Sequence, residues 1–433
     1  MTIFDERESE VRSYCRTWPA VFERAGGSWL YAENGRAYLD FFAGAGALNY
    51  GHNNPVLKGA LIDYLAGDGI IHSLDMYTVA KREFLTAFDE LILRPRRLDY
   101  QVQFPGPGGA NAVEAALKLA RKVTGRTEVI SFTNAFHGMT LGALSITGSA
   151  FHRGGAGVPL AHATPMPFDP SPGSDGAPGS SWFERLLDDS SSGLDKPAAV
   201  IVETVQGEGG INVARAEWLR GLAGLCQRHD ILLIVDDVQM GCGRTGPFFS
   251  FETAGITPDI VCLSKSIGGY GLPMALTLIR PDLDIWQPGE HNGTFRGVNP
   301  AFVTGTAALH AYWRDDKLER ATLAKGQRIA TTLTALAESV PGTVIRPRGR
   351  GLAHGLAFES GELAGKVSSA AFERGLLVET CGPQGSVIKL LPPLLVTDTE
   401  LDQGLALLAD ATQAICLSSA LKQKEVPLCT RRD

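Results

Sequence analysis

The sequence lacks several features that would each have indicated a particular class of protein. No apolar run approaches the ~20 residues that a membrane-spanning helix needs, and the charged start MTIFDERESEVRSY is unlike a secretory signal. The seven cysteines form no CxxC or Cys/His cluster, so neither a disulfide framework nor a zinc site is expected. The net charge of −7 argues against nucleic-acid binding. We expect a soluble cytoplasmic protein with reduced thiols, no metal site, and no membrane or nucleic-acid partner.

Short apolar runs alternate with helix-like segments in the centre of the chain. Five runs have the length and composition of buried strands: 100–104, 128–132, 198–203, 231–236 and 259–264. The nearly continuous apolar character of the last three is typical of parallel strands covered on both faces. Residues 111–125 predict an amphipathic helix that ends at Gly125. This alternation predicts an α/β domain with a mostly parallel sheet.

The two ends of the chain have a different texture, in which short strands and helices are mixed. Residues 29–42 predict a hairpin with Asn34 and Gly35 in its turn. We expect a small α+β domain made from 1–65 and 320–433, with a large α/β domain at 66–319 between them. The polar tail from residue 421 is expected to fray.

Polar and aromatic residues follow the predicted strands, at the edge where open α/β sheets bind ligands. They are the loop 108–111, Phe136, His137, Glu203, Glu208, Asp236, Asp237, Gln239 and Lys265. Each has an ordinary explanation when taken alone. A glycine-rich turn, a helix N-cap, a buried histidine or a solvated lysine would account for any one of them.

One cofactor would use most of these residues together. A lysine amine that loses its proton in a desolvated site can attack a carbonyl and form a Schiff base. Pyridoxal phosphate needs such a lysine, an anion site, an acid beside its ring nitrogen and a flat group against the ring. The loop before the helix at 111–125 offers N–H groups for a phosphate. The sequence therefore predicts a pyridoxal phosphate site that contains Lys265 and Asp236.

Two segments carry a family resemblance that extends over roughly 15–415. IVDDVQMGCGRTGPFFSFE and PDIVCLSKSIGGYGLPMA resemble the signature segments of the class III, ornithine-type aminotransferases of pyridoxal phosphate fold type I. The resemblance implies a large domain with a mostly parallel central sheet and a smaller α+β domain. It also implies small-molecule amino-acid substrates and a homodimer with shared active sites, or a tetramer built from such dimers.

The resemblance also implies roles for individual residues. Lys265 would form the Schiff base and shuttle a proton, Asp236 would pair with the pyridine nitrogen, and Glu208 would lie beside the substrate. The other implied cofactor contacts are Gly108, Gly109, Ala110, Phe136, His137, Glu203, Val238, Gln239 and Thr294, the last reaching the phosphate in the partner subunit. The implied substrate contacts are Asn49, Tyr50, Arg296 and Lys389.

Several segments, including YLDFFAGAGALNYGHNNP and HSLDMYTVAKREF, resemble one branch of the family. That branch moves an amino group from L-glutamate to L-aspartate 4-semialdehyde, giving L-2,4-diaminobutyrate for ectoine biosynthesis by a ping-pong route through a pyridoxamine form. Lys389 stands where many class III members carry an arginine that grips a substrate carboxylate, and this replacement is typical of the branch. A lysine offers a point charge instead of a bidentate fork.

Departures from the family pattern affect two parts of the expected site, the phosphate loop and the residue that binds the substrate carboxylate. Gly108 and Ala110 replace hydroxyl residues of the phosphate loop, which predicts weaker cofactor retention. The carboxylate clamp could be Arg296, Arg348 or Arg350, although the last two also suit a basic surface turn. Two other functions stay open: a class III ω-aminotransferase for ornithine, 4-aminobutyrate or a specialised-metabolite amine, and a catalytically silent homologue that binds pyridoxal phosphate.

Overall fold

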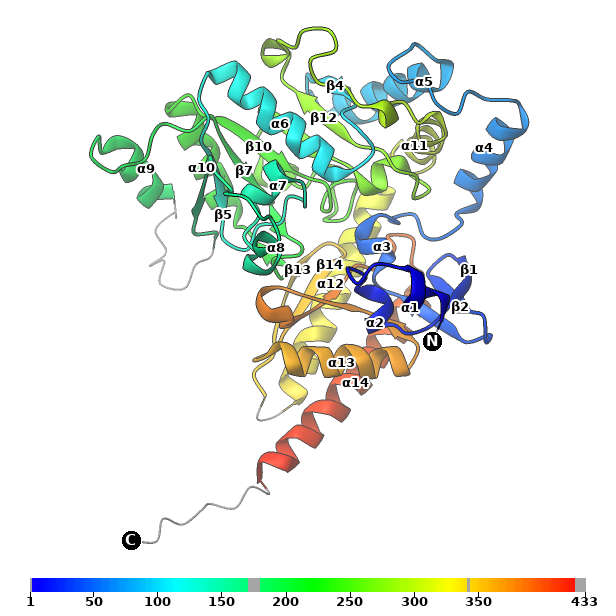
Figure 1. Cartoon of the computed structure of the whole chain (residues 1–433). Helices are drawn as coiled ribbons and strands as arrows, with labels where there is room; N and C mark the ends of the chain where they lie inside the picture. The colour runs from blue at the N-terminus through cyan, green and yellow to red at the C-terminus, as the bar shows by residue number, and fades with distance from the viewer. Residues whose placement is uncertain (1, 170–179, 341–342, 425–433) are drawn as a thin grey trace, which may run out of the picture.

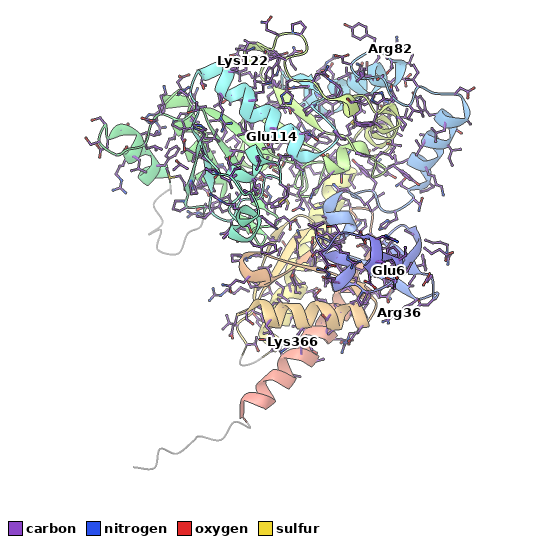
Figure 2. The ribbon with its side chains drawn as sticks, in the orientation of Figure 1. Glu6, Arg36, Arg82, Glu114, Lys122 and Lys366 are labelled. Atoms are coloured by element: carbon purple, nitrogen blue, oxygen red, sulfur yellow. The ribbon has the colours of Figure 1, made fainter. Side chains whose placement is uncertain are left out.

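The computed structural model describes residues 2–169, 180–340 and 343–424 (Figure 1). It has a larger upper part around a central sheet and a smaller lower part, from which the last helix projects. Lys122 and Lys366 lie on the outer surfaces of the two parts, far from each other (Figure 2). The end of the predicted tail, 425–433, lies outside the described residues.

A seven-stranded sheet forms the centre of the larger part, in the order β4-β12-β11-β10-β7-β5-β6. β11, β10, β7, β5 and β6 run parallel, whereas β12 is antiparallel to both of its neighbours. The strands span Gln101–Gln103 (β4), Val129–Phe132 (β5), Ala163–Met166 (β6), Ala199–Val202 (β7), Leu232–Asp236 (β10), Ile260–Leu263 (β11) and Leu276–Ile279 (β12). Every residue of β5, β7, β10 and β11 is buried. The predicted mostly parallel, doubly covered sheet is therefore confirmed.

Apolar side chains on both faces of this sheet explain its burial. In β7, Ile201 belongs to the core beneath α6, whereas Val200 and Val202 belong to the core that contains Trp218. This alternation follows from the two-residue period of a strand. The covering helices are α6 (Gly109–Thr124) on one face and α10 (Ala216–Arg228) on the other (Figure 1). α6 ends at Gly125 with a left-handed φ of 67°, as predicted.

Both ends of the chain contribute to the smaller part. One sheet has the order β1-β2-β3-β15, from Phe22–Gly26, Trp29–Ala32, Ala37–Asp40 and Leu376–Leu377, so strands from the two ends pair directly. The predicted hairpin is β2 and β3, and Gly35 in its turn has a φ of 82°. A second sheet has the order β13-β14-β17-β16, from Arg346–Arg350, Ala353–Ala357, Val387–Leu390 and Glu379–Cys381.

The remaining elements connect and cover these sheets. In the smaller part they are α1 (Ile3–Arg7), α2 (Tyr14–Thr17), α3 (Ala43–Gly46), α12 (Lys317–Ser339), α13 (Gly361–Glu373) and α14 (Asp398–Lys424). In the larger part they are α4 (Pro55–Ala66), α5 (Val79–Phe88), α7 (Leu141–Ser145), α8 (Ala150–Gly154), α9 (Ser180–Asp188), α11 (Asn299–Tyr312) and the short pair β8 (Val205–Gln206) and β9 (Asn212–Val213). α4 packs against α11, so it lies with the larger part although the predicted boundary at residue 65 placed it with the smaller.

Among the described residues, no helix is both long and apolar enough to cross a membrane. The same residues hold no group of three or more His, Cys, Asp or Glu side chains that could bind a metal ion.

A single buried arginine joins three distant segments of the chain. The Arg244 side chain is fully buried. Its guanidinium donates hydrogen bonds to the carbonyl oxygens of Leu352 (3.0 Å) and Pro392 (2.5 Å) and to Oδ1 of Asn49 (2.6 Å). Because buried polar groups are costly when unpaired, these bonds hold the N-terminal segment and the smaller part against the central sheet.

We predict that Arg244→Met lowers the free energy of unfolding by about 3 kcal/mol, because it leaves three buried acceptors without their donor. Urea denaturation followed by circular dichroism measures the change. The matched control is Arg82→Met on α5, since Arg82 is exposed (Figure 2). Equal stability of the two variants would contradict a joining role for Arg244.

Candidate functional site

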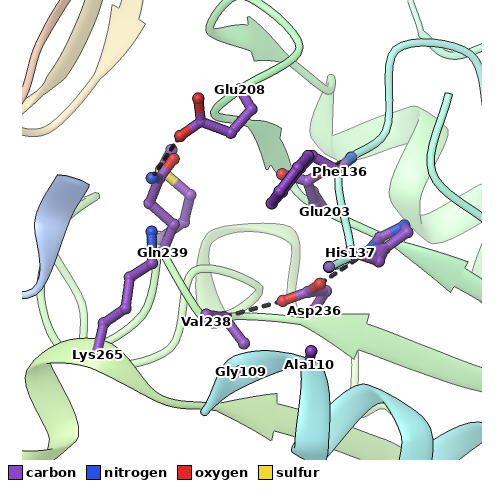
Figure 3. Close-up of a pocket in the computed structure, with 12 residues that line it drawn as sticks. Gly109, Ala110, Phe136, His137, Glu203, Glu208, Asp236, Val238, Gln239 and Lys265 are labelled. Carbon is purple, nitrogen blue, oxygen red and sulfur yellow. Dashed lines mark hydrogen bonds and ion pairs between the residues drawn. The ribbon is translucent and has the colours of Figure 1, made fainter. Parts of the chain in front are cut away.

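A pocket of about 180 Å³ lies where the parallel strands end and α6 begins (Figure 3). Its lining is Gly109, Ala110, Phe136, His137, Gly138, Glu203, Glu208, Asp236, Val238, Gln239, Met240 and Lys265. The lining includes every predicted cofactor residue except Gly108 and Thr294, and it adds Gly138, Glu208 and Met240. The structure thus brings together side chains that are up to about 150 positions apart in the sequence, because parallel strands end at one edge of the sheet.

Lys265 lies two residues after the end of β11 and enters the pocket from one side (Figure 3). Its φ of 52° is left-handed, which is uncommon for a side chain other than glycine and is typical of strained functional positions. Its Nζ donates a hydrogen bond to the carbonyl oxygen of Ala45 at 2.7 Å. Burial lowers the pKa of Lys265; the charge of Glu208 opposes this shift and that of Lys389 adds to it. A lowered pKa increases the fraction of Lys265 that is neutral, and the neutral amine is the nucleophilic form.

Asp236 ends β10, and two contacts orient its carboxylate in the pocket. Oδ1 accepts the N–H of Val238 at 3.1 Å, and Oδ2 lies 2.7 Å from Nδ1 of His137. Burial alone would lower the pKa of His137, but the hydrogen bond and the charge of Asp236 outweigh it, so the pKa is raised. Nε2 of His137 is buried and has no partner among the described residues. His137 is therefore a support for Asp236 at the back of the pocket.

Glu203, the residue after β7, accepts hydrogen bonds that fix the backbone of Phe136. Its Oε1 accepts the N–H of Phe136 at 2.9 Å, and its Oε2 accepts the N–H of Gly207 at 3.2 Å. Burial raises the pKa of Glu203 to about 7, with the charge of His137 opposing and that of Asp236 adding to the shift. The ring of Phe136 is thereby positioned over the pocket (Figure 3).

Small residues keep a narrow space open between Phe136 and Val238. A Cβ added to Gly109 would come within 2.7 Å of Cγ1 of Val238. A Cβ on Gly138, whose φ is 136°, would come within 2.8 Å of Cβ of Ala110. Both positions exclude larger side chains, so a flat group can lie there without displacing the backbone.

The first turn of α6 forms the anion-binding end of this space. The N–H groups at the start of a helix lack intrahelical acceptors and carry the positive end of its dipole. Gly109 and Ala110 start this 16-residue helix. Gly108 is the N-cap, and its N–H donates instead to Oδ1 of Asn111 at 3.0 Å. Gly108 thus shapes the helix entry and does not line the pocket.

These residues fit pyridoxal phosphate. Lys265 supplies the amine and Asp236 supplies the acid. Phe136 and Val238 lie on the two sides of the space for the ring. Gly109 and Ala110 supply N–H groups for a phosphate. Oε1 of Gln239 is buried and has no partner among the described residues, which leaves it free to bind a polar group of the cofactor.

A buried ion pair marks the other end of the pocket. Lys389 is fully buried, and its Nζ lies 2.5 Å from Oε1 of Glu208. The same Oε1 accepts a hydrogen bond from Nε2 of Gln239 at 3.0 Å. Lys389 therefore reaches the pocket through Glu208 and does not line it directly. A second cavity of about 810 Å³ adjoins this end and shares Phe136 and Glu208 with the first.

Two predicted substrate residues, Asn49 and Tyr50, lie in the core. Asn49 donates to the carbonyl oxygen of Cys242 at 2.9 Å and accepts from Arg244. The hydroxyl of Tyr50 accepts a hydrogen bond from Nε1 of Trp313 at 2.8 Å. Neither residue lines the pocket, although the N–H of Asn49 donates to Oγ of Ser266, the neighbour of Lys265, at 3.3 Å.

The candidate arginines also lie outside the pocket. Arg348 donates to Oδ1 of Asn212 at 2.8 Å, and Arg350 donates to Oγ1 of Thr204 at 2.8 Å, so β13 binds the larger part instead of forming a surface turn. Arg296 donates to Oδ1 of Asn292 at 2.9 Å. Thr294, two residues before it, is exposed. Neither residue lines this chain's pocket.

Sequence reasoning missed Gly138 and Met240 in the first cavity and Tyr14 and Glu379 in the second. Glu379 had a detectable signal, because a charged residue inside the apolar run LLVETC is unusual for a buried strand. Tyr14 had none, since an aromatic residue near a chain end is ordinary.

The raised pKa of Glu203 predicts a pH-dependent stability. A carboxyl whose pKa is raised in the folded state stabilises the fold below its unfolded pKa of 4.5, and the contribution is lost as the pH rises through about 7. We expect the stability advantage of the wild type over Glu203→Gln to shrink by about 3 kcal/mol between pH 4.5 and 8. Chemical denaturation at a series of pH values measures it. A constant difference would show that Glu203 titrates normally.

Comparisons with known proteins agree with this geometry. The Aminotransferase class-III family model matches residues 12–412. The chain is 67% identical over 414 residues to a diaminobutyrate–2-oxoglutarate transaminase of Nocardia farcinica, covering 96% of this chain and 94% of the relative. It is 65% identical over 415 residues to the transaminase of the same name from Streptomyces avermitilis, covering 95% and 98%.

Solved structures show the same architecture. The ornithine aminotransferase of Toxoplasma gondii, crystallised with partial occupancy of PLP at its active site, superimposes with a TM-score of 0.82 at 25% identity, covering 98% of this chain and 95% of that one. A transaminase from the marine bacterium Virgibacillus shares the fold with a TM-score of 0.83 at 19% identity, covering 96% and 99%. With the family match spanning nearly the whole chain, this protein belongs to the class-III aminotransferases.

Proposed function

We propose that this chain is a pyridoxal phosphate-dependent aminotransferase that moves an amino group from L-glutamate to L-aspartate 4-semialdehyde. The products are L-2,4-diaminobutyrate and 2-oxoglutarate. We further propose that it acts in the cytoplasm as a homodimer and that its product enters ectoine biosynthesis. The observation that carries the proposal is the 67% identity, over nearly the full length, to a diaminobutyrate–2-oxoglutarate transaminase.

When bound, pyridoxal phosphate supplies an electrophilic carbonyl carbon and a protonated ring that withdraws electrons from the substrate. The residues of the chain bind and orient it. The N–H groups at the start of α6 take the phosphate, the Asp236 carboxylate faces the pocket with His137 behind it, and Phe136 and Val238 exclude water from the two ring faces.

Lys265 is the residue that moves a proton in this site. Because burial lowers its pKa, its Nζ loses its proton more easily than an exposed lysine does, and the neutral amine can accept a proton from a substrate carbon. In the free site this Nζ is held by the carbonyl oxygen of Ala45. Breaking that one hydrogen bond frees the amine to move between neighbouring positions.

The proposed dimer is supported by an apolar patch beside Thr294. Ile70, Ile71, Leu74, Met76, Tyr77, Val79 and Phe295 are all exposed. The two segments of this patch lie together, since Nε2 of His72 is 2.6 Å from the carbonyl oxygen of Thr294. Apolar patches of this kind are typical of interfaces. A second copy on this patch would contact the segment that contains Thr294.

The substrate proposal predicts a selective single turnover. We expect L-2,4-diaminobutyrate, added without an acceptor, to remove the visible absorbance of the bound cofactor at least about tenfold faster than L-ornithine, because one methylene in a fitted pocket is worth that much. It should also react faster than 4-aminobutyrate, which has the same chain length but lacks the α-amino group. Lys265→Ala should show no such turnover. Faster reaction with ornithine would leave an aminotransferase with a different substrate. Failure to acquire the absorbance after incubation with pyridoxal phosphate would favour a silent homologue.

The dimer proposal predicts a mass near twice the 46.2 kDa of the chain in sedimentation equilibrium. The double variant Met76→Asp/Tyr77→Asp should move the mass towards one chain, because buried unpaired carboxylates oppose association. Leu417→Asp is the control, since Leu417 is exposed on α14 and lies outside the patch. A monomeric wild type, or a dimer unaffected by the double variant, would contradict this interface.

A further inference from the structure

One backbone oxygen, the carbonyl oxygen of Ala45, holds two side chains of the pocket. It accepts a hydrogen bond from Nζ of Lys265 at 2.7 Å and another from Nε2 of Gln239 at 3.0 Å (Figure 3). A carbonyl oxygen has two lone pairs, so these two donors use both. The place of this oxygen therefore affects where the Lys265 amine lies in the site.

The turn that carries this oxygen is left-handed. Its four residues, Ala43, Gly44, Ala45 and Gly46, have φ of 46°, 59°, 55° and 83°. Residues other than glycine adopt this conformation rarely and singly, because Cβ comes too close to the following carbonyl oxygen. Two of the four residues are alanines, so the turn is strained and persists only where its surroundings hold it.

A buried carboxylate holds the start of the turn. Asp40, at the end of β3, is 1% exposed, and its Oδ1 accepts the N–H groups of Phe42 and Ala43, both at 2.8 Å. Its Oδ2 lies 2.7 Å from Nε2 of His52. The backbone of His52 in turn exchanges two hydrogen bonds with Gly27, in the turn between β1 and β2. Asp40 thus fixes the turn against the first sheet of the smaller part.

The end of the turn is held by the neighbour of the pocket lysine. Oγ of Ser266 donates a hydrogen bond to the carbonyl oxygen of Gly46 at 2.8 Å and accepts the N–H of Asn49 at 3.3 Å. Asp40 and Ser266 therefore hold the two ends of the turn, and Ala45 lies between them. Movement at either end would displace the oxygen that binds the Lys265 amine.

We propose that Asp40, which lines neither cavity, is a positioning residue: it holds the left-handed turn so that the Ala45 carbonyl fixes the amine of Lys265. A neutral amine that donates one N–H to a fixed acceptor directs its lone pair away from that acceptor, so the direction of attack is set before the cofactor arrives. The inference rests on the proposed function only in that Lys265 binds pyridoxal phosphate.

Charged groups on other segments also act on Lys265. Burial has the largest effect and lowers its pKa. The charged groups that face it are Glu208, Lys389, Glu379 and Asp236, of which the lysine adds to this shift and the carboxylates oppose it. The Ala45 carbonyl opposes it as well, because an ammonium donates a stronger hydrogen bond than a neutral amine does. Loss of this acceptor therefore lowers the pKa of Lys265 further.

The experiment measures how fast the full chain, stripped of cofactor, captures pyridoxal phosphate from about pH 6 to about pH 10. The neutral amine of Lys265 attacks the aldehyde carbon, a C=N bond forms and water leaves, so the rate constant rises with pH to a plateau. Its midpoint reports the pKa of Lys265, and its plateau reports how well the neutral amine is placed. Comparison between variants cancels the titration of pyridoxal phosphate itself.

We expect Asp40→Ala to lower the midpoint by about one pH unit, the tenfold change in proton affinity that one hydrogen bond to a charged group is worth. The plateau should fall several-fold, because the amine is no longer directed. Asp40→Asn should restore most of both values, since its amide oxygen can accept the same two N–H groups and its NH₂ can donate to His52.

The matched control is Asp169→Ala. Asp169 is also buried, accepts the N–H of Arg215 at 2.9 Å and pairs with its guanidinium, but it lines neither cavity. This variant should lose stability and keep the wild-type midpoint and plateau. Lys265→Ala should capture nothing. If Asp40→Ala does not fold, His52→Leu replaces it, because it frees one side of the Asp40 carboxylate, and it should lower the midpoint or the plateau.

An unchanged midpoint and plateau in Asp40→Ala, or in His52→Leu where that variant replaces it, would overturn the inference. Equal shifts in Asp40→Ala and Asp40→Asn would also overturn it, because the charge of Asp40 and not its hold on the turn would then be the cause. The same shift in Asp169→Ala would show a general effect of destabilisation. Failure of the proposed function looks different: with a wrong substrate the wild type still captures pyridoxal phosphate, and with a wrong cofactor it captures none and the inference falls with it.

Discussion

The whole site depends on one constraint, which is the burial of the parallel strands on both faces. Strands such as β7 and β10 are covered by helices on each side, so their side chains must be apolar until the strand ends. The polar residues Glu203 and Asp236 lie at the carboxyl-terminal edge of the sheet, where the strands end. The N-terminus of α6 lies at the same edge. The N–H groups that can bind an anion and the carboxylate of Asp236 therefore line one pocket.

Charges buried at this edge are held in matched groups. Asp236 is paired with His137, and Glu203 accepts two backbone N–H groups. At the other end, Lys389 is enclosed by Glu208 and Glu379. Because an unpaired buried charge costs several kcal/mol, each group can change its partner only when a ligand brings a compensating charge.

The site is also shared between the two parts of the molecule. Lys265, Asp236 and Glu208 come from the larger part, whereas Lys389 and Glu379 come from the second sheet of the smaller part. Arg244 ties these parts together through hydrogen bonds to Leu352 and Pro392. The far end of the pocket is therefore formed only when the two parts are docked, and the charge group there depends on that docking.

The sequence by itself predicted the mostly parallel sheet, a helix at 111–125 that spans Gly109–Thr124 in the structure, and most of the residues that line the pocket, because apolar runs and the polar residues that follow them are local patterns. Only the tertiary structure decided which polar residues stay outside. Asn49 and Tyr50 are adjacent to the family's substrate segment in sequence, yet hydrogen bonds to Cys242 and Trp313 hold them in the core. Glu379 entered the site for the converse reason, since strand register across 10 positions of chain places it beside Lys389. Pairing between distant segments is set by packing and charge balance, which no local pattern encodes.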